Sequence, residues 1–220
     1  MNFTKKIISY LYPIKVKEIS SKRSGSLEVT LVNGKLVIDS ENANYSYGSL
    51  QQVLKIGLTH IGLDNLQKSE NILVLGVAGG SVIKTLRNDF NIEAKITGVE
   101  IDPDVIELAN TYFKLNSISN LELVIEDAFQ FIKTTQETYD LIIIDIFNDS
   151  NMPNELFEDG FWTTIRQLLN NKGFCLFNSI CTSKKDMNRN QQLNTLLENL
   201  FKFSKQLKTH RINELFILEK

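Results

Sequence analysis

The chain has 220 residues, of which 42% are hydrophobic, so it is long enough to bury a full core without covalent or metal staples. Its formal net charge of -2, with scattered lysines, gives no electrostatic basis for nucleic-acid binding. Two cysteines and two histidines are too few for a disulfide framework or a recognisable metal site, so we expect no bound metal.

No stretch approaches the ~18 consecutive apolar residues of a membrane span. The apolar stretch near the N-terminus is short, is interrupted by Ser9 and is not followed by a small-residue cleavage site. We therefore expect a cytoplasmic protein that binds neither membrane nor nucleic acid.

Residues 1–44 have the pattern of a small N-terminal antiparallel β unit. The dipeptide Asn33-Gly34 is typical of a two-residue hairpin turn. The alternating apolar and polar stretches that would form the strands are residues 14–19, 27–31 and 35–38. This part of the chain is predicted to be a separate unit from residues 45–220.

Strand and helix patterns alternate over the larger unit, after a loop at residues 42–49 and a helix at 49–61. The later strands are predicted at residues 72–75, 95–101, 121–125, 139–146 and 173–180, with helices at 155–169 and 184–201 among those between them. Residues 204–210 and 212–218 can pair as a hairpin. This order predicts an α/β fold with a doubly wound, mostly parallel seven-stranded sheet that ends in an antiparallel hairpin, with the very apolar strand 139–146 at its centre.

Residues 71–86 carry the first candidate ligand site. An apolar strand ends at Gly76, and Gly79 and Gly80 precede a helical pattern. Such a turn brings backbone N–H groups and the positive end of a helix close to a ligand that no Cβ obstructs, which suits a nucleotide or nucleoside. Glycines at this position also serve tight packing alone, so both interpretations stay open.

Acidic residues follow the next strands, at the sheet edge where ligands bind in doubly wound folds. Glu100 lies roughly 20 residues after the glycine turn, where an acid accepts hydrogen bonds from ribose hydroxyls. Asp127 either accepts from an adenine amino group or caps the following helix. For Asp102, before Pro103, we favour a helix cap.

Asp145 ends the most apolar strand, where an unpartnered carboxylate would be costly to bury. We expect it to face a pocket, with a raised pKa, and to hold and deprotonate an attacking amine. Asp149, in the polar loop just beyond, either shares that role or organises the loop.

These motifs together resemble the spermidine synthase-like branch of the class I S-adenosylmethionine-dependent methyltransferase fold. The segments that carry the resemblance are Tyr45 to Tyr47, Val99 to Pro103, Glu126 to Phe129 and Tyr139 to Asp145. The resemblance implies that Glu100 binds ribose, that Asp127 binds adenine and that Asp145 orients and activates an amine. Tyr45 and Tyr47 would line the pocket or stack on a cation, or would simply pack.

Three positions depart from the aminopropyltransferases of that family. Gly79 stands where they have an acid that pairs with the amine of decarboxylated S-adenosylmethionine. Gly48 and Ser49 replace a Gln or His followed by Glu, and Asp149 is displaced by one residue from the family's second acid. Every departure affects recognition of the aminopropyl group or the polyamine.

The sequence therefore predicts a transferase that binds S-adenosylmethionine, or a close sulfonium nucleoside, as co-substrate and passes an alkyl group, mainly methyl, to a small acceptor. With Gly79 in place of an acid, bare backbone N–H groups would attract the carboxylate of intact S-adenosylmethionine. The alternatives are an aminopropyltransferase (spermidine synthase) that uses decarboxylated S-adenosylmethionine and a polyamine, and a non-catalytic nucleoside-binding protein. A nicotinamide-dependent oxidoreductase fits less well, because the Gly-x-Gly-x-x-Gly spacing is missing. The exposed strand edges of the β unit favour a homodimer.

Overall fold

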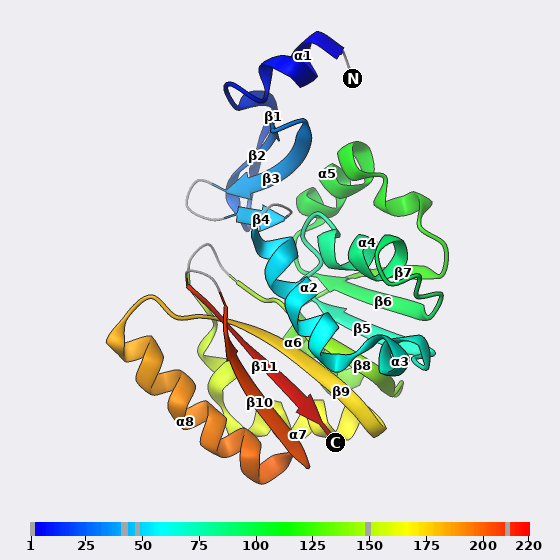
Figure 1. Cartoon of the computed structure of the whole chain (residues 1–220), viewed down its shortest axis with the longest axis vertical. Helices are drawn as coiled ribbons and strands as arrows, with labels where there is room; N and C mark the ends of the chain where they lie inside the picture. The colour runs from blue at the N-terminus through cyan, green and yellow to red at the C-terminus, as the bar shows by residue number, and fades with distance from the viewer. Residues whose placement is uncertain (1–2, 41–43, 47–48, 148–150, 210–211) are drawn as a thin grey trace.

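The computed structural model describes residues 3–40, 44–46, 49–147, 151–209 and 212–220. Its larger sheet has seven strands, which are β5 (Asn71–Leu75), β6 (Lys95–Glu100), β7 (Leu121–Ile125), β8 (Tyr139–Ile144), β9 (Leu169–Ile180), β10 (Phe203–Lys208) and β11 (Asn213–Glu219). They are arranged in the order β10-β11-β9-β8-β5-β6-β7, and only the pairs that involve β10 or β11 are antiparallel. The predicted doubly wound sheet with its terminal hairpin is confirmed, and β8 lies at the centre (Figure 1).

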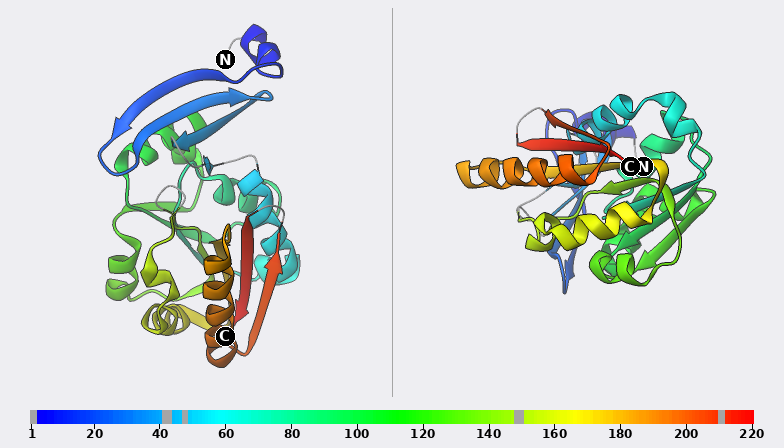
Figure 2. Two further views of the ribbon diagram at one scale, coloured as in Figure 1. Left: turned by 90° about the vertical axis from the view of Figure 1, so that its left-hand side faces the viewer. Right: turned by 90° about the horizontal axis from the view of Figure 1, so that it is seen from below.

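Helices cover both faces of this sheet (Figure 2). They are α2 (Ser49–Ile61), α3 (Leu63–Gln67), α4 (Ser81–Asn88), α5 (Pro103–Phe113), α6 (Ala128–Thr134), α7 (Asp159–Leu168) and α8 (Lys184–Leu200), with short 3-10 turns η1 (Leu115–Ser117) and η2 (Asn154–Phe157). In β8, Leu141 and Ile143 pack in the core with α2 and α4, whereas Ile142 and Ile144 pack with α7 and α8. Because alternate residues of a strand point to opposite faces, the continuous apolar run from Leu141 to Ile144 indicates burial on both sides of the sheet.

A second, antiparallel sheet lies above the larger one, with the helix α1 (Phe3–Ile8) at its tip (Figure 1). Its strands are β1 (Ile14–Ser21), β2 (Gly25–Val32), β3 (Lys35–Ser40) and β4 (Asn44–Ser46), in that order. The predicted hairpin at Asn33-Gly34 is confirmed, since both residues have positive φ and Val32 pairs with Lys35. The division of the chain into two units at residue 44 stays a prediction.

The structure corrects several predicted elements. Residues 44–46 form a strand rather than a loop, because they hydrogen-bond to β3. The helix predicted at 155–169 begins only at Asp159, after a 3-10 turn, and β9 begins four residues earlier than predicted, at Leu169. The helices α1 and α3 had no counterpart in the prediction. Over the part of the chain that the structure describes, no helix is long and apolar enough to cross a membrane.

One buried carboxylate ties the two sheets together. Asp102 is only 1% exposed and caps α5 by accepting a 2.9 Å hydrogen bond from the backbone N–H of Asp104, as the sequence predicts. Its other oxygen accepts hydrogen bonds of 2.5 and 2.6 Å from the hydroxyls of Ser21 and Ser24, at the β1–β2 turn. Around it, Leu27, Val29 and Ile38 of the small sheet pack against Val105, Leu108 and Phe113 of α5. Asp102 therefore fixes the small sheet to the start of the helix that follows β6.

We expect Asp102→Ala to lower the free energy of unfolding by ~2 kcal/mol or more, because it removes a helix cap and leaves two hydroxyls without their acceptor. Urea unfolding followed by circular dichroism measures this change. Asp104→Ala is the matched control, since it removes a carboxylate from the same helical turn and should cost less than ~1 kcal/mol. Equal losses for the two variants would show that Asp102 does not hold the sheets together.

Candidate functional site

The glycine turn between β5 and α4 passes directly against the end of β8. Gly76 and Gly80 have positive φ, of 88° and 76°. A Cβ on Gly76 would overlap the backbone carbonyl of Asp145, and one on Gly80 would overlap the side chain of Leu115. Tight packing thus explains these two glycines by itself. Gly79 is buried and is not among the glycines with positive φ.

Glu100 is folded into this turn. Its Oε2 accepts hydrogen bonds from the N–H groups of Val77 and Ala78, at 3.1 and 3.0 Å, and its Oε1 accepts one from Asp102 at 3.1 Å. The side chain is 8% exposed. Burial raises the pKa of Glu100, and the backbone hydrogen bonds oppose this effect. The carboxylate thus organises the turn, and its predicted contact with ribose stays a prediction.

The backbone donors of the turn already have partners. The N–H of Gly76 donates to Val99, that of Gly80 donates to Val77, and those of Val77 and Ala78 donate to Glu100. The sequence-based argument for intact S-adenosylmethionine required free N–H groups that would attract its carboxylate. In this structure these four groups are not free, so that argument loses its main support.

Asp127 and Asp145 follow the ends of β7 and β8, which are separated in the sheet by β6 and β5. Asp127 caps α6, accepting hydrogen bonds of 2.7 and 3.3 Å from the N–H groups of Phe129 and Gln130. The cap confirms one of its two predicted roles, and adenine binding stays a prediction. Asp145 is partly buried, and desolvation raises its pKa to about 6, opposed by a hydrogen bond from Asn178. A carboxyl group with this pKa can accept and release a proton near neutral pH.

Asn178 is a site residue that the sequence analysis missed. It lies on β9, is 0% exposed, and donates from Nδ2 to Oδ1 of Asp145 at 2.9 Å. The available signal was an amide within the otherwise apolar strand pattern, since a buried amide requires hydrogen-bond partners. The predicted site residues Tyr47 and Asp149 lie outside the described residues.

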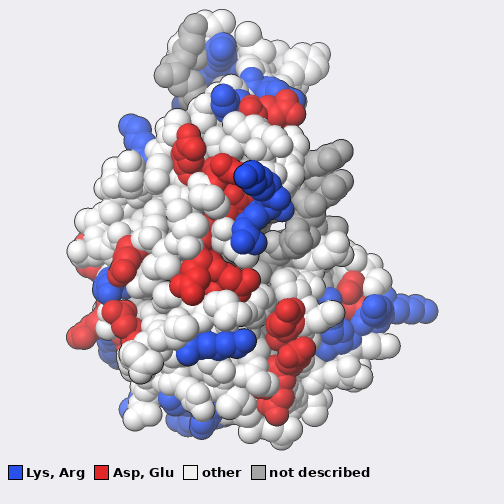
Figure 3. Space-filling model, turned by 180° about the vertical axis from the view of Figure 1, so that it is seen from behind, with Lys and Arg blue, Asp and Glu red and all other residues white. Residues whose placement is uncertain are grey.

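The strand ends place the acids in one row, with Asp127 after β7, Glu100 and Asp102 at the end of β6, the glycine turn after β5, and Asp145 after β8. Adjacent strands are ~4.8 Å apart, so the row from Asp127 to Asp145 spans roughly 15 Å. None of the ion pairs among the described residues involves Glu100, Asp102, Asp127 or Asp145. On the face in Figure 3, Asp and Glu side chains lie across the middle of the surface with Lys and Arg side chains among them. Among the described residues, these carboxylates accept hydrogen bonds from backbone N–H groups, hydroxyls and an amide rather than from cations.

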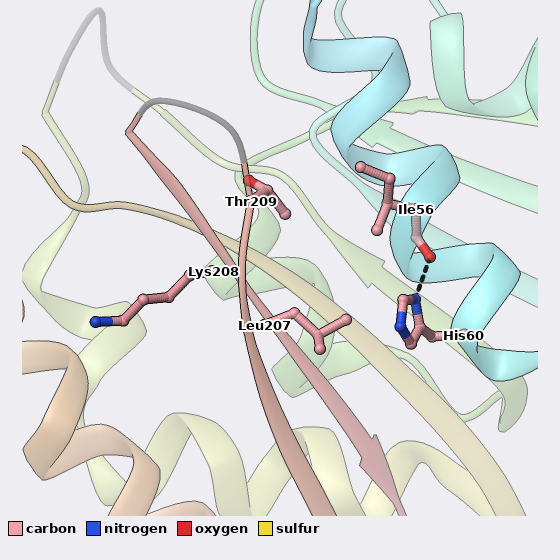
Figure 4. A pocket seen from close by; sticks show the side chains of 5 residues that line it. All are labelled: Ile56, His60, Leu207, Lys208 and Thr209. Atoms are coloured by element: carbon pink, nitrogen blue, oxygen red, sulfur yellow. Dashed lines mark hydrogen bonds between the residues drawn. The ribbon is translucent and has the colours of Figure 1, made fainter.

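A cavity of about 370 Å³ lies away from this row, between α2 and β10 (Figure 4). It is lined by Ile56, His60, Leu207, Lys208 and Thr209. His60 uses Nδ1 within its own helix, 2.9 Å from the carbonyl oxygen of Ile56. The cavity contains none of the predicted site residues. Among the described residues, no three His, Cys, Asp or Glu side chains are grouped closely enough to hold a metal ion.

Comparison with solved structures shows the fold. The structure is similar to spermidine synthase from Thermotoga maritima, with a TM-score of 0.73 and 16% identity over 94% of this chain and 72% of that one. It is also similar to human methyltransferase-like protein 13 in complex with SAH, with a TM-score of 0.67 and 21% identity over 78% of this chain and 82% of that one. The expected class I methyltransferase-like architecture is confirmed.

Comparison with known sequences identifies the family within this fold. The chain is 34% identical over 132 residues to the polyamine aminopropyltransferase of Vibrio vulnificus, covering 59% of this chain and 44% of that protein. It is 28% identical over 158 residues to the polyamine aminopropyltransferase of Prochlorococcus marinus, and the match covers 68% of this chain and 54% of that protein. The chain thus spans about half the length of these relatives. The spermine/spermidine synthase domain matches residues 52–211, which include the glycine turn, Glu100, Asp127 and Asp145. This chain belongs to the spermine/spermidine synthase domain family.

Proposed function

We propose that the chain is an aminopropyltransferase, which transfers the aminopropyl group of decarboxylated S-adenosylmethionine to a polyamine or similar small amine. The observation that carries the proposal is the row of carboxylates without cationic partners. Decarboxylated S-adenosylmethionine carries a sulfonium and an ammonium and has no carboxylate, so a negative site favours it over the intact form. The family and the names of the relatives support the same alternative over methyl transfer.

The residues of the site suit a direct displacement. The lone pair of the acceptor nitrogen attacks the carbon bonded to the sulfonium, the new C–N bond forms as the C–S bond breaks, and a neutral thioether nucleoside leaves. The nitrogen then gives up a proton, for which Asp145, with a pKa of about 6, is the acceptor. Because the sulfonium is already an activated leaving group, most of the catalysis is alignment of the two substrates.

Methyl transfer from intact S-adenosylmethionine is the second candidate, and Gly79 is the observation that favours it. An acid at this position would pair with the amine of the decarboxylated form, and this chain has none there.

A cytoplasmic location, as expected from the sequence, also stays a prediction.

Calorimetric titration with the two co-substrates separates these candidates. We expect wild type to bind decarboxylated S-adenosylmethionine at least tenfold more tightly than the intact form. Gly79→Asp should widen this preference, because the added carboxylate attracts the amine and repels the carboxylate. Gly160→Asp adds the same charge at an exposed position with no neighbour within 4 Å of its Cβ and should change nothing. A preference for the intact form would overturn the proposal in favour of methyl transfer, and binding of neither would favour a non-catalytic protein.

Asp145→Asn should reduce turnover by ~10²-fold or more while leaving the affinity for decarboxylated S-adenosylmethionine within about threefold of wild type. In wild type, kcat/KM should fall as the pH drops through about 6, because Asp145 must be ionised to accept a proton. This fall in kcat/KM, the acid limb of the pH profile, should be missing from the residual activity of Asp145→Asn. Steady-state kinetics between pH 5 and pH 9 provide the test, with the exposed Asp89→Asn as control. An unchanged acid limb in Asp145→Asn would remove Asp145 from the chemistry.

We further propose that the chain forms a homodimer through its N-terminal tip rather than through a strand edge. All described side chains of α1 are exposed, including Phe3 at 77%, and Leu11 just beyond is 75% exposed. The edge strand β1 instead has a register shift between Lys15 and Lys17, and a bulge with lysines protects an edge from pairing. Exposed apolar side chains gathered in one segment are typical of an interface.

Sedimentation equilibrium should therefore give about twice the 25.1 kDa of the chain. The double variant Phe3→Ser, Leu11→Ser should sediment as a monomer. Phe203→Ser, at a 45% exposed position on β10, is the control and should stay dimeric. A wild-type monomer, or a double variant that still dimerises, would contradict this interface.

A further inference from the structure

A row of three polar side chains crosses the larger sheet at Asp145. Asn178 on β9 donates from Nδ2 to Oδ1 of Asp145 at 2.9 Å, and Asn213 at the start of β11 donates from Nδ2 to Oδ1 of Asn178 at 3.1 Å. The three residues are 33 and 35 positions apart in the sequence, yet they lie on three adjacent strands. The antiparallel hairpin at the sheet edge is thereby connected to the proposed catalytic acid.

The three residues occupy the same face of the sheet. The residues two and four positions before Asp145 are Ile143 and Leu141, which belong to the core under α2, as does Leu176, two positions before Asn178. On β11, which runs in the opposite direction, Leu215 and Ile217 follow Asn213 on that face. The polar row is therefore the last layer of an otherwise apolar face, at the edge where the ligand site lies.

The hydrogen bonds have one possible direction when Asp145 is ionised. A carboxylate only accepts, so the NH₂ group of Asn178 must face it, which turns the carbonyl oxygen of Asn178 toward β11. That buried oxygen needs a donor, and Asn213 supplies it. Among the described residues, Asn213 provides the hydrogen bond on the β11 side that favours one of the two orientations of the Asn178 amide. In the reversed orientation its carbonyl oxygen would face the carboxylate.

The arrangement also selects which oxygen of Asp145 faces the substrate. Among the hydrogen bonds between described residues, Asn178 supplies the one donor to the Asp145 side chain, and it bonds to Oδ1. Oδ2 is then available to accept a proton. Burial raises the pKa of Asp145 and the hydrogen bond from Asn178 lowers it, and these are the two influences that come from the described residues.

We propose that Asn178 and Asn213 are positioning residues, which hold Asp145 with Oδ2 directed at the acceptor amine and keep the amide of Asn178 in its donating orientation. The inference rests on the proposed function, because it assigns these residues a role in the proton acceptance by Asp145. Asn213 acts through Asn178 and touches neither substrate.

Two measurements on Asn213→Ala test the inference. The first is a ¹³C NMR titration of the Asp145 carboxyl, which needs no activity. Loss of the orienting donor should raise the pKa of Asp145 above its wild-type value, because the carboxylate loses part of its stabilisation by Asn178. The second is kcat/KM, which should fall roughly tenfold with its acid limb moved upward by the same amount as in the NMR titration. Asn213→Ser, which keeps a hydroxyl donor, should lie between wild type and Asn213→Ala and serves if the alanine variant does not fold.

Asn190→Ala is the matched control. Asn190 is 0% exposed and bonds to Ser179 at 2.9 Å and to Glu214 at 2.8 Å, so its replacement removes an amide that is buried more deeply than that of Asn213 beside the same strands. It has no bond to Asp145 and should leave the pKa and the acid limb unchanged. An unmoved pKa in Asn213→Ala, or an equal shift in Asn190→Ala, would overturn the positioning role. If the aminopropyl proposal alone is wrong, the NMR shift still appears while no aminopropyl transfer is detected.

Discussion

The close approach of two strand ends, β5 at Gly76 and β8 at Asp145, is the constraint on which the rest of the site depends. The ladder between these strands continues one residue past the end of β8, since the N–H of Asp145 donates to the carbonyl of Leu75 at 2.9 Å. The turn after β5 then has to pass the carbonyl of Asp145, which leaves no space for a Cβ at position 76. The glycine turn and the proposed catalytic acid are therefore one rigid unit. Under the proposed function, a nucleoside held at the turn would have its reacting group beside Asp145.

The turn is also stabilised from inside the protein. Glu100 accepts three backbone N–H groups, so its negative charge is compensated by peptide dipoles rather than by a lysine or arginine. Asp102 and Asp127 are compensated in the same way by helix N-termini and hydroxyls. Carboxylates that are held by dipoles keep their net charge, and the field they create outside remains negative. Such a site can be well folded and still suit the doubly positive co-substrate of the proposed function.

By the family resemblance, the departures from the family pattern affect recognition of the aminopropyl group and the acceptor. Gly79, Gly48 and the displaced Asp149 concern this recognition, whereas the segments that build the sheet, the turn and the caps are kept. The small sheet is fixed to the same unit through Asp102, so its position relative to the site follows from a buried contact with α5. Differences in acceptor specificity can therefore arise in this region without changing the nucleoside half.

The strands β5 to β9, the hairpin at Asn33-Gly34 and the cap Asp102 were determined by the sequence alone, because each depends on side chains within a few residues of one another. For Asp127 the sequence left a helix cap and a contact with adenine open. A continuous apolar run such as Leu141 to Ile144 can only be satisfied by burial on both faces, and this requirement placed β8 at the centre of the sheet. The position of Asp145 at the end of that strand, and hence its candidacy as an acid or base, followed in the same way.

Only the tertiary structure decided what these residues bind inside the protein. Glu100 bonds to a turn 22 and 23 residues away, which uses the backbone donors that the sequence had left free for a ligand. Asn178 and Asn213 meet Asp145 because the register of three strands aligns them, and the strand β4 forms because β3 offers it hydrogen bonds. Local patterns record which side chains must be buried and where a helix starts. They do not record the register between distant strands, and that register selects the hydrogen-bond partners that set the charge and orientation of the site.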